Sequence, residues 1–146
     1  MNARNRLAPW ACLLTLTLAT GSAAFAEEPI RLRILSYNIH HGEGMDGTLD
    51  LERIARVIKS VDPHVVALQE VDRGVRRTQG IDEPAELGRL TGLTPYFERN
   101  IPFQGGDYGN AVLSRLPVEG WKNVPVPSHY VGEQRGVLAL DLTAPD

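Results

Sequence analysis

Two residues in the middle of the chain have side chains of the kind that hold divalent cations. Glu70 follows the apolar run 65–68, and Asn38 follows an apolar segment that ends at Tyr37. Hard cations prefer oxygen ligands, and Mg²⁺ often takes only one or two protein carboxylates together with phosphate oxygens. The pair therefore indicates a candidate metal site, although either residue alone is also explained as a solvated strand end or a turn.

Four further residues have side chains that bind phosphate groups: His40, Tyr108, Asn110 and Arg135. A guanidinium binds phosphate through its planar fork, and a phenol or an amide hydrogen-bonds to phosphate oxygens. Each also has a simpler explanation. Local hydrogen bonds would explain the histidine, turn formation the tyrosine and the asparagine, and an ion pair with Glu133 the arginine. The histidine and its neighbour lack the H-E-x-x-H spacing, which argues against a zinc protease.

The elements that must position these side chains follow from hydrophobic spacing. Alternating apolar residues predict a strand over 30–38, and the continuous apolar run predicts a strand over 65–68 that is buried on both faces. Between them, Asp50 is expected to cap a helix. One face of this helix is apolar: Leu51, Ile54, Val57, Ile58 and Val61. Because this order favours parallel strands, Asn38 and Glu70 are expected to end their strands at the same edge of a sheet.

A second helix and three more strands are predicted in the remaining sequence. Asp82 is expected to cap a helix that ends near Gly92, and the glycine-rich segment 104–107 is expected to be a loop. Strands are expected over 110–114, 121–126 and 136–142. Three arginines are expected to form a solvated basic face: Arg73, Arg76 and Arg77. The last strand is apolar on both faces and requires a covering layer, so the chain is expected to be an interrupted domain.

The N-terminal segment has the composition of an export signal. Arg4 and Arg6 precede an apolar run and a small-residue tract that ends in the A-x-A sequence 24–26. This order predicts a secretory signal peptide over 1–26, and the apolar run is too short for a stable membrane anchor. Its removal takes away two of the 15 basic residues and none of the 18 acidic ones, which leaves 27–146 with a net charge of −5. Such an acidic domain has no basic surface for sequence-independent nucleic-acid binding.

Three segments in order resemble the endonuclease/exonuclease/phosphatase superfamily, which has the DNase I-like fold. They are S-Y-N-I-H-H-G at 36–42, L-Q-E-V-D at 68–72 and Y-G-N-A-V-L-S-R at 108–115. The resemblance covers nearly all of 31–142. It implies an α/β fold, the DNase I-like four-layer α/β sandwich, with two central mixed sheets flanked by helices. Only the N-terminal part of that sandwich, over 27–146, is expected in this chain.

The resemblance also implies hydrolysis of phosphodiester or phosphomonoester bonds with Mg²⁺ or Mn²⁺. Glu70 matches the metal-binding glutamate of the family, and Asn38 matches the asparagine beside it. Tyr108 lies close to the position of a phosphate-contacting tyrosine, and Arg135 resembles the arginine that precedes the following strand. His40 is a departure, because relatives carry a second acid or a basic phosphate contact there.

The catalytic residues of the family's second half have no counterpart in this sequence. They are the aspartate and asparagine of a G-D-x-N motif, a histidine that follows a strand, and an S-D-H motif. Because these residues activate the attacking water, the chain alone is expected to be inactive. The full-length member is expected to be an exported hydrolase, periplasmic or secreted, of nucleic acid, a phospholipid headgroup or a small phosphodiester, with no protein partner predicted. The alternative is an extracytoplasmic module that binds a phosphate ligand or a polyanion without catalysis.

Overall fold

The computed structural model describes residues 30–127, 129 and 131–144, so the signal peptide predicted over 1–26 lies outside the described residues. The elements follow the chain in the order β1 (Ile34–Asn38), η1 (His40–Gly42), α1 (Leu51–Val61), β2 (Val65–Arg73), η2 (Arg76–Thr78), α2 (Glu83–Thr91), β3 (Thr94–Phe103), β4 (Gly106–Ser114), β5 (Val118–Pro125) and β6 (Gly136–Leu142), where η marks a short 3₁₀ helix. None of the helices in this described part is long and apolar enough to cross a membrane.

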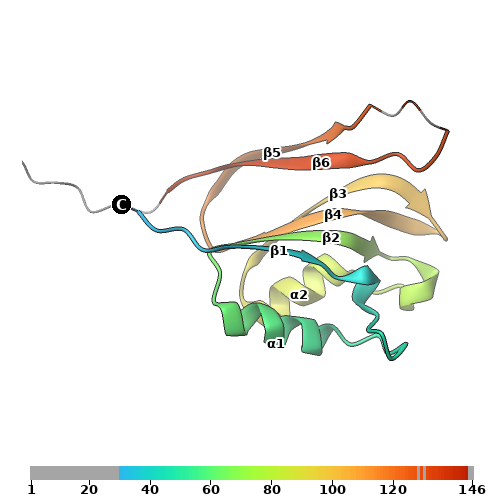
Figure 1. Cartoon of the computed structure of the whole chain (residues 1–146), viewed down its shortest axis with the longest axis horizontal. Helices are drawn as coiled ribbons and strands as arrows, with labels where there is room; N and C mark the ends of the chain where they lie inside the picture. Colours follow the sequence, from blue (N-terminus) through green and yellow to red (C-terminus); the bar gives the residue numbers. More distant parts are fainter. Residues whose placement is uncertain (1–29, 128, 130, 145–146) are drawn as a thin grey trace, which may run out of the picture.

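The described elements are stacked in layers (Figure 1). A four-stranded sheet in the order β1-β2-β4-β3 lies in the middle, with α1 and α2 on one face and the β5–β6 hairpin on the other. β1 pairs parallel to β2, as the strand-helix-strand order predicts, and the remaining pairs are antiparallel. This mixed arrangement of sheets and helices confirms the predicted α/β fold class.

Alternate residues of the two central strands supply a hydrophobic core on each side of the sheet. Val66 and Leu113 are completely buried against the helices. Val65 and Val112 point to the other face, where they pack against Leu140 of β6. The prediction that this segment of β2 is buried on both faces is therefore confirmed, and this burial holds the layers together.

Both predicted helix caps are present. The Asp50 side chain accepts a hydrogen bond from Arg53 N at 2.8 Å, and the Asp82 side chain accepts one from Ala85 N at 3.0 Å. The predicted apolar face of α1 is only partly buried, because Val57 is 41% exposed. It lines a groove at the open edge of β1, where no further strand of the described chain lies.

The hydrophobic pattern does not predict β3, which contains Pro95 and Pro102. β3 is an edge strand, and an edge strand tolerates proline because its outer side needs no ladder hydrogen bonds. The segment 104–107, predicted as a loop, is reduced to the turn of Gln104 and Gly105, whose φ angles are 44° and 90°. Positive φ at both positions matches the twist of a tight hairpin, and the rest of the segment belongs to β4.

The strand predicted over 30–38 begins only at Ile34, because its partner β2 begins at Val65. Ile34 is 64% exposed, since β1 turns its alternate residues Leu35 and Tyr37 toward the helical core.

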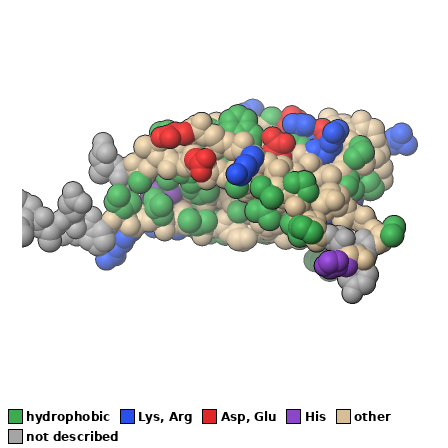
Figure 2. Space-filling model, turned by 90° about the horizontal axis from the view of Figure 1, so that it is seen from above, with side chains coloured by type: hydrophobic (Ala, Val, Ile, Leu, Met, Phe, Trp, Pro, Cys, Tyr) green, Lys and Arg blue, Asp and Glu red, His purple; other side chains and the backbone are tan. Residues whose placement is uncertain are grey.

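The β5–β6 hairpin presents hydrophobic side chains on its outer face (Figure 2). Val124 of β5 is 44% exposed and Val137 of β6 is 55% exposed, and the two are opposite each other in the hairpin. On the inner face of β6, Leu138 and Leu140 pack against the central sheet. One apolar face of β6 is therefore without cover within the described part of the chain.

Candidate functional site

The end of β1 and the middle of β2 bring Asn38 and Glu70 into contact. Asn38 Nδ2 donates a hydrogen bond to Glu70 Oε1 at 2.8 Å, and Asn38 Oδ1 accepts one from His40 N at 3.0 Å. Because a backbone N–H only donates, the second bond determines which atom of the amide is the oxygen. The predicted proximity of the two residues is confirmed, and Asn38 presents its amino group to Glu70, so that it orients the carboxylate.

Glu70 does not end its strand, contrary to the prediction. β2 continues to Arg73, and its register with β4 shifts between Leu68 and Val71. Within this bulge Glu70 has a φ of 58°, in the left-handed region that residues other than glycine rarely adopt. Bulges re-aim side chains, and strained backbone is found disproportionately at functional sites. The bulge is thus the local feature that places the Glu70 carboxylate beside Asn38.

Glu70 and Asn38 line a cavity of about 300 Å³ together with three other predicted residues, Tyr108, Asn110 and Arg135. The lining comes from the end of β1, the bulge of β2, Asn100 of β3, the first half of β4 and the start of β6. Residues up to 98 positions apart in the sequence thereby face one space, which is the arrangement expected of a binding site.

The three residues across the cavity differ in how firmly they are held. Asn110 Nδ2 donates to Gly136 O at 2.8 Å and so anchors the start of β6. Burial, together with the negative charge of Glu70, raises the pKa of the Tyr108 phenol, which keeps it a hydrogen-bond donor. Arg135 forms the ion pair with Glu133 that the sequence offers as an alternative, with Nη1 and Oε1 3.3 Å apart. This pair is largely exposed and is therefore weak.

His40 does not line this cavity, although it is predicted to bind substrate. Its Nδ1 lies 3.3 Å from Glu43 O, which corresponds to the local hydrogen bond given as the alternative. Its φ of 46° turns the chain at η1 and leaves the side chain on the groove along the β1 edge. Asn38 and His40 both line this groove, but only Asn38 also reaches the cavity that contains Glu70.

The donor set at the cavity fits a hard divalent cation with few protein ligands. Among residues 30–127, 129 and 131–144, no group of three His, Cys, Asp or Glu residues lies close enough together to hold a metal. Within that part of the chain, Asn38 alone hydrogen-bonds the Glu70 carboxylate, through Oε1. Since Mg²⁺ keeps several waters and needs only one or two carboxylates plus phosphate oxygens, Glu70 in a polar cavity of this size suits Mg²⁺ or Mn²⁺.

An ion pair next to the cavity, between a partly exposed arginine and a buried aspartate, is not predicted by the sequence pattern. The Arg77 guanidinium donates two hydrogen bonds to Asp72, at 2.7 and 2.8 Å, and Asp72 is completely buried. Arg77 also lies over the rings of Phe103 and Tyr108, at 4.7 and 5.4 Å from their centroids. The expectation of a solvated basic face holds only in part for this residue, because its side chain is 29% exposed but its guanidinium is paired with a carboxylate and lies over two aromatic rings.

Arg73 is likewise paired, although its side chain is 42% exposed. Its Nη2 lies 2.6 Å from Asp107 Oδ2, and its guanidinium lies over the Phe97 ring at 4.4 Å from the centroid. Register explains the ion pair, because Arg73 of β2 is directly opposite Asp107 of β4. Cross-strand partners of this kind cannot be predicted from the sequence until the pairing of the strands is known.

Glu83, the first residue of α2, is completely buried, and its Oε2 accepts a hydrogen bond from Asp72 N at 2.8 Å. Burial raises the pKa of this carboxyl from 4.5 to about 8. The native state therefore keeps a proton that the unfolded chain releases, so this stabilisation is complete below pH 4.5 and is lost as the pH rises through about 8.

We expect the free energy of unfolding to fall across this pH window relative to the Glu83→Gln variant, by at most about 1.4 kcal/mol per pH unit. Urea denaturation of both proteins at several pH values measures the difference, in which the titration of other groups cancels. Parallel stability curves for the two proteins would contradict a protonated Glu83 in the native state.

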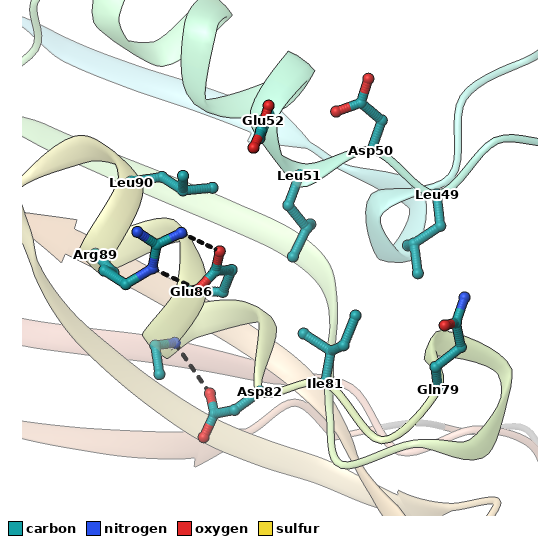
Figure 3. A pocket seen from close by; sticks show the side chains of 11 residues that line it. Leu49, Asp50, Leu51, Glu52, Gln79, Ile81, Asp82, Glu86, Arg89 and Leu90 are labelled. Carbon is teal, nitrogen blue, oxygen red and sulfur yellow. Dashed lines mark hydrogen bonds and ion pairs between the residues drawn. The ribbon is translucent and has the colours of Figure 1, made fainter.

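A larger cavity, of about 760 Å³, lies on the opposite side of the sheet between the start of α1 and α2 (Figure 3). Its apolar lining includes Leu49, Leu51, Ile81 and Leu90. Its one basic side chain, Arg89, is paired with Glu86, with Nη2 and Oε1 2.6 Å apart. The remaining charged residues there are acidic, so this cavity repels phosphate and does not compete with the site at Glu70.

The chain is similar to a curated bacterial protein and to several solved structures. It is 29% identical over 126 residues to the uncharacterized protein YbhP of Escherichia coli strain K12, an alignment that covers 77% of this chain and 47% of YbhP. The chain thus spans about half the length of the curated relatives it matches.

Solved structures share the arrangement of elements. A crystal structure of an endonuclease/exonuclease/phosphatase from Beutenbergia cavernae is 33% identical, with a TM-score of 0.63 over 78% of this chain and 35% of the other. TDP2 from Caenorhabditis elegans is 25% identical, with a TM-score of 0.56 over 86% of this chain and 39% of the other. Residues 35–145 match the sequence profile of the Endonuclease/Exonuclease/phosphatase family. The match contains both strands that carry Asn38 and Glu70, and the chain belongs to this family.

Proposed function

We propose that this chain is the metal-binding N-terminal half of an exported hydrolase that cleaves phosphodiester bonds with Mg²⁺ or Mn²⁺. The observation that carries the proposal is the cavity of about 300 Å³ in which Glu70 faces Tyr108 and Arg135. A carboxylate for a cation and a guanidinium and a phenol for phosphate oxygens then lie around one space, which suits a cation–phosphate ligand. Family membership supports the same chemistry.

Each residue has a distinct part in this proposal. Glu70 holds the cation, and Asn38 fixes the orientation of its carboxylate. Arg135 and Tyr108 bind the phosphate oxygens, while Asn110 keeps the start of β6 in place. A cation bound there would polarise a phosphate oxygen and neutralise charge in the transition state. Nucleic acid, a phospholipid headgroup and a small phosphodiester all carry the phosphate group that such a site recognises.

The test is hydrolysis of bis-p-nitrophenyl phosphate with Mg²⁺ or Mn²⁺. We expect no turnover by this chain alone, because groups that activate water are expected in the second half of the fold. Fusion to the corresponding second half of a relative is expected to restore metal-dependent turnover. Turnover by the chain alone, above that of its Glu70→Gln variant, would show that the residues present suffice for hydrolysis.

The competing function is a phosphate-binding module without catalysis. Glu70 is the one acidic side chain among the described residues that line the cavity, and no described histidine lines it, which favours this alternative. The two functions differ in the same assay. A fused protein that binds inorganic phosphate or the diester but never hydrolyses it would establish the binding module.

Export is part of the proposal and rests on the order of basic, apolar and small residues over 1–26. Expression in a bacterium with an intact export pathway is expected to give an extracytoplasmic product that begins at Glu27. N-terminal sequencing of that product checks the cleavage site. A mature protein that retains Trp10 would contradict it.

A further inference from the structure

The carboxyl group of Glu83 is buried, and only one of its oxygens has a partner. Oε2 accepts the hydrogen bond from Asp72 N, but Oε1 has no hydrogen-bond partner in the described part of the chain. Buried polar atoms are almost always paired, so an acid kept in such a place requires an explanation. The contacts of this carboxyl group with β2 and with η1 supply an explanation.

The first contact supports the segment of β2 that follows Glu70. β1 ends at Asn38, whose register partner is Gln69, whereas β2 continues to Arg73. Beyond this point no named strand of the described chain pairs with β2 on the β1 side, and only a single bridge joins Arg73 to Asp82. The Asp72 N–H, two residues after the strained Glu70, is bonded to the Glu83 carboxyl instead. Glu83 thus takes the place of a strand partner at Asp72, directly after the bulge.

The second contact supports the turn that follows Asn38. A Cβ atom placed on Gly42 would lie 3.0 Å from Glu83 Oε1, so this oxygen packs directly against the last residue of η1. Gly42 has a φ of 76°, which glycine adopts without strain. The same turn contains His40, whose N–H holds the Asn38 amide oxygen. One carboxyl group therefore touches both segments that carry the Asn38–Glu70 pair.

We propose that Glu83 is a positioning residue of the metal site. Its carboxyl group holds the turn after Asn38 against β2 just after the bulge, and so keeps Asn38 and Glu70 within hydrogen-bond distance. The inference rests on the proposed function only for the role of this pair in metal binding. The acid form of Glu83 suits this place, because two charged groups already face it, Asp72 of β2 and Arg77 of η2, and these two neutralise each other.

The test uses Mn²⁺ alone, titrated onto the 146-residue chain and followed by electron paramagnetic resonance. Glu83→Met removes the accepting oxygen at similar length and is expected to weaken Mn²⁺ binding by up to about 10-fold, the lower end of the effect of losing a group that bonds a metal ligand directly, because Glu83 acts through Asp72 N and Gly42. Glu83→Gln keeps an oxygen for Asp72 N and is expected to bind Mn²⁺ like the wild type. The matched control is Glu86→Met on the same helix, which is expected to change nothing. A folded Glu83→Met protein with wild-type affinity would overturn the proposal.

A second measurement needs neither metal nor the Met variant. The NMR signal of the Asn38 side-chain amide reports its hydrogen bond to Glu70 directly. His40 and His41 lie close to Asn38 in both proteins, so the readout is the difference between them: a shift that accompanies the loss of the Glu83 proton is expected in the wild type and is expected to be absent from Glu83→Gln. Equal behaviour of the two proteins would overturn the positioning role. If the wild type binds no Mn²⁺, the proposed function fails, while the Asn38 signal still decides the role of Glu83.

Discussion

Glu70→Gln is expected to weaken Mg²⁺ and Mn²⁺ binding strongly and to lower metal-dependent hydrolysis by about 100-fold or more. Glutamine keeps the shape of the side chain and an oxygen that accepts the hydrogen bond from Asn38, so the bulge of β2 is expected to keep its conformation. What is lost is the negative charge at the cavity. Stabilisation of transition-state charge by a metal is worth several kcal/mol, and about 1.4 kcal/mol corresponds to a factor of ten in rate.

Isothermal titration with Mn²⁺ on the chain, and turnover of the fused protein at limiting metal, measure the two parts of this prediction. Glu52→Gln is a suitable control, because Glu52 lies on α1 with an exposed side chain. Circular dichroism and the unfolding transition should be unchanged in both variants. Wild-type turnover by Glu70→Gln at limiting metal would refute the assignment of Glu70.

Arg77→Met is expected to destabilise the fold by about 3–5 kcal/mol. The substitution leaves the completely buried Asp72 carboxylate without its two charge-assisted hydrogen bonds, and an uncompensated buried charge costs about this much. It also removes the guanidinium from the Phe103 and Tyr108 rings, so the wall of the cavity is expected to loosen. Denaturant unfolding gives the change in free energy.

A double-mutant cycle separates the charge from the packing. Asp72→Asn removes the negative charge that Arg77→Met leaves unpaired, so the double variant is expected to be more stable than Arg77→Met alone. Arg76→Met, at an exposed neighbouring position, is the control and is expected to stay within about 0.5 kcal/mol of the wild type. Additive losses in the double variant would mean that the pair does not act as a unit.

Local signals in the sequence were sufficient for the helices and for part of the site. Asp50 and Asp82 are followed by helical spacing of apolar residues, and both make the predicted cap bonds. A cap is a contact between residues three apart, so it needs no knowledge of the rest of the fold. The juxtaposition of Asn38 and Glu70 required one further rule, that a strand, a helix and a strand pair in parallel, and the register of β1 and β2 obeys it.

The sequence by itself therefore determined the family, the order of most elements, the caps and the pairing of Asn38 with Glu70. The tertiary structure alone decided the bulge at Glu70 and the edge position that lets β3 contain prolines. It also decided which charged residues around the site are paired, buried or solvated. Arg76 and Arg77 are neighbours of the same type and both reach solvent, yet the buried Asp72 pairs with Arg77. Glu83 is buried in the first turn of a helix, where acids are ordinarily solvated. The reason is physical: whether a charge is solvated or paired depends on which strands and turns enclose it, and that enclosure arises from contacts between distant segments rather than from the spacing of neighbours along the chain.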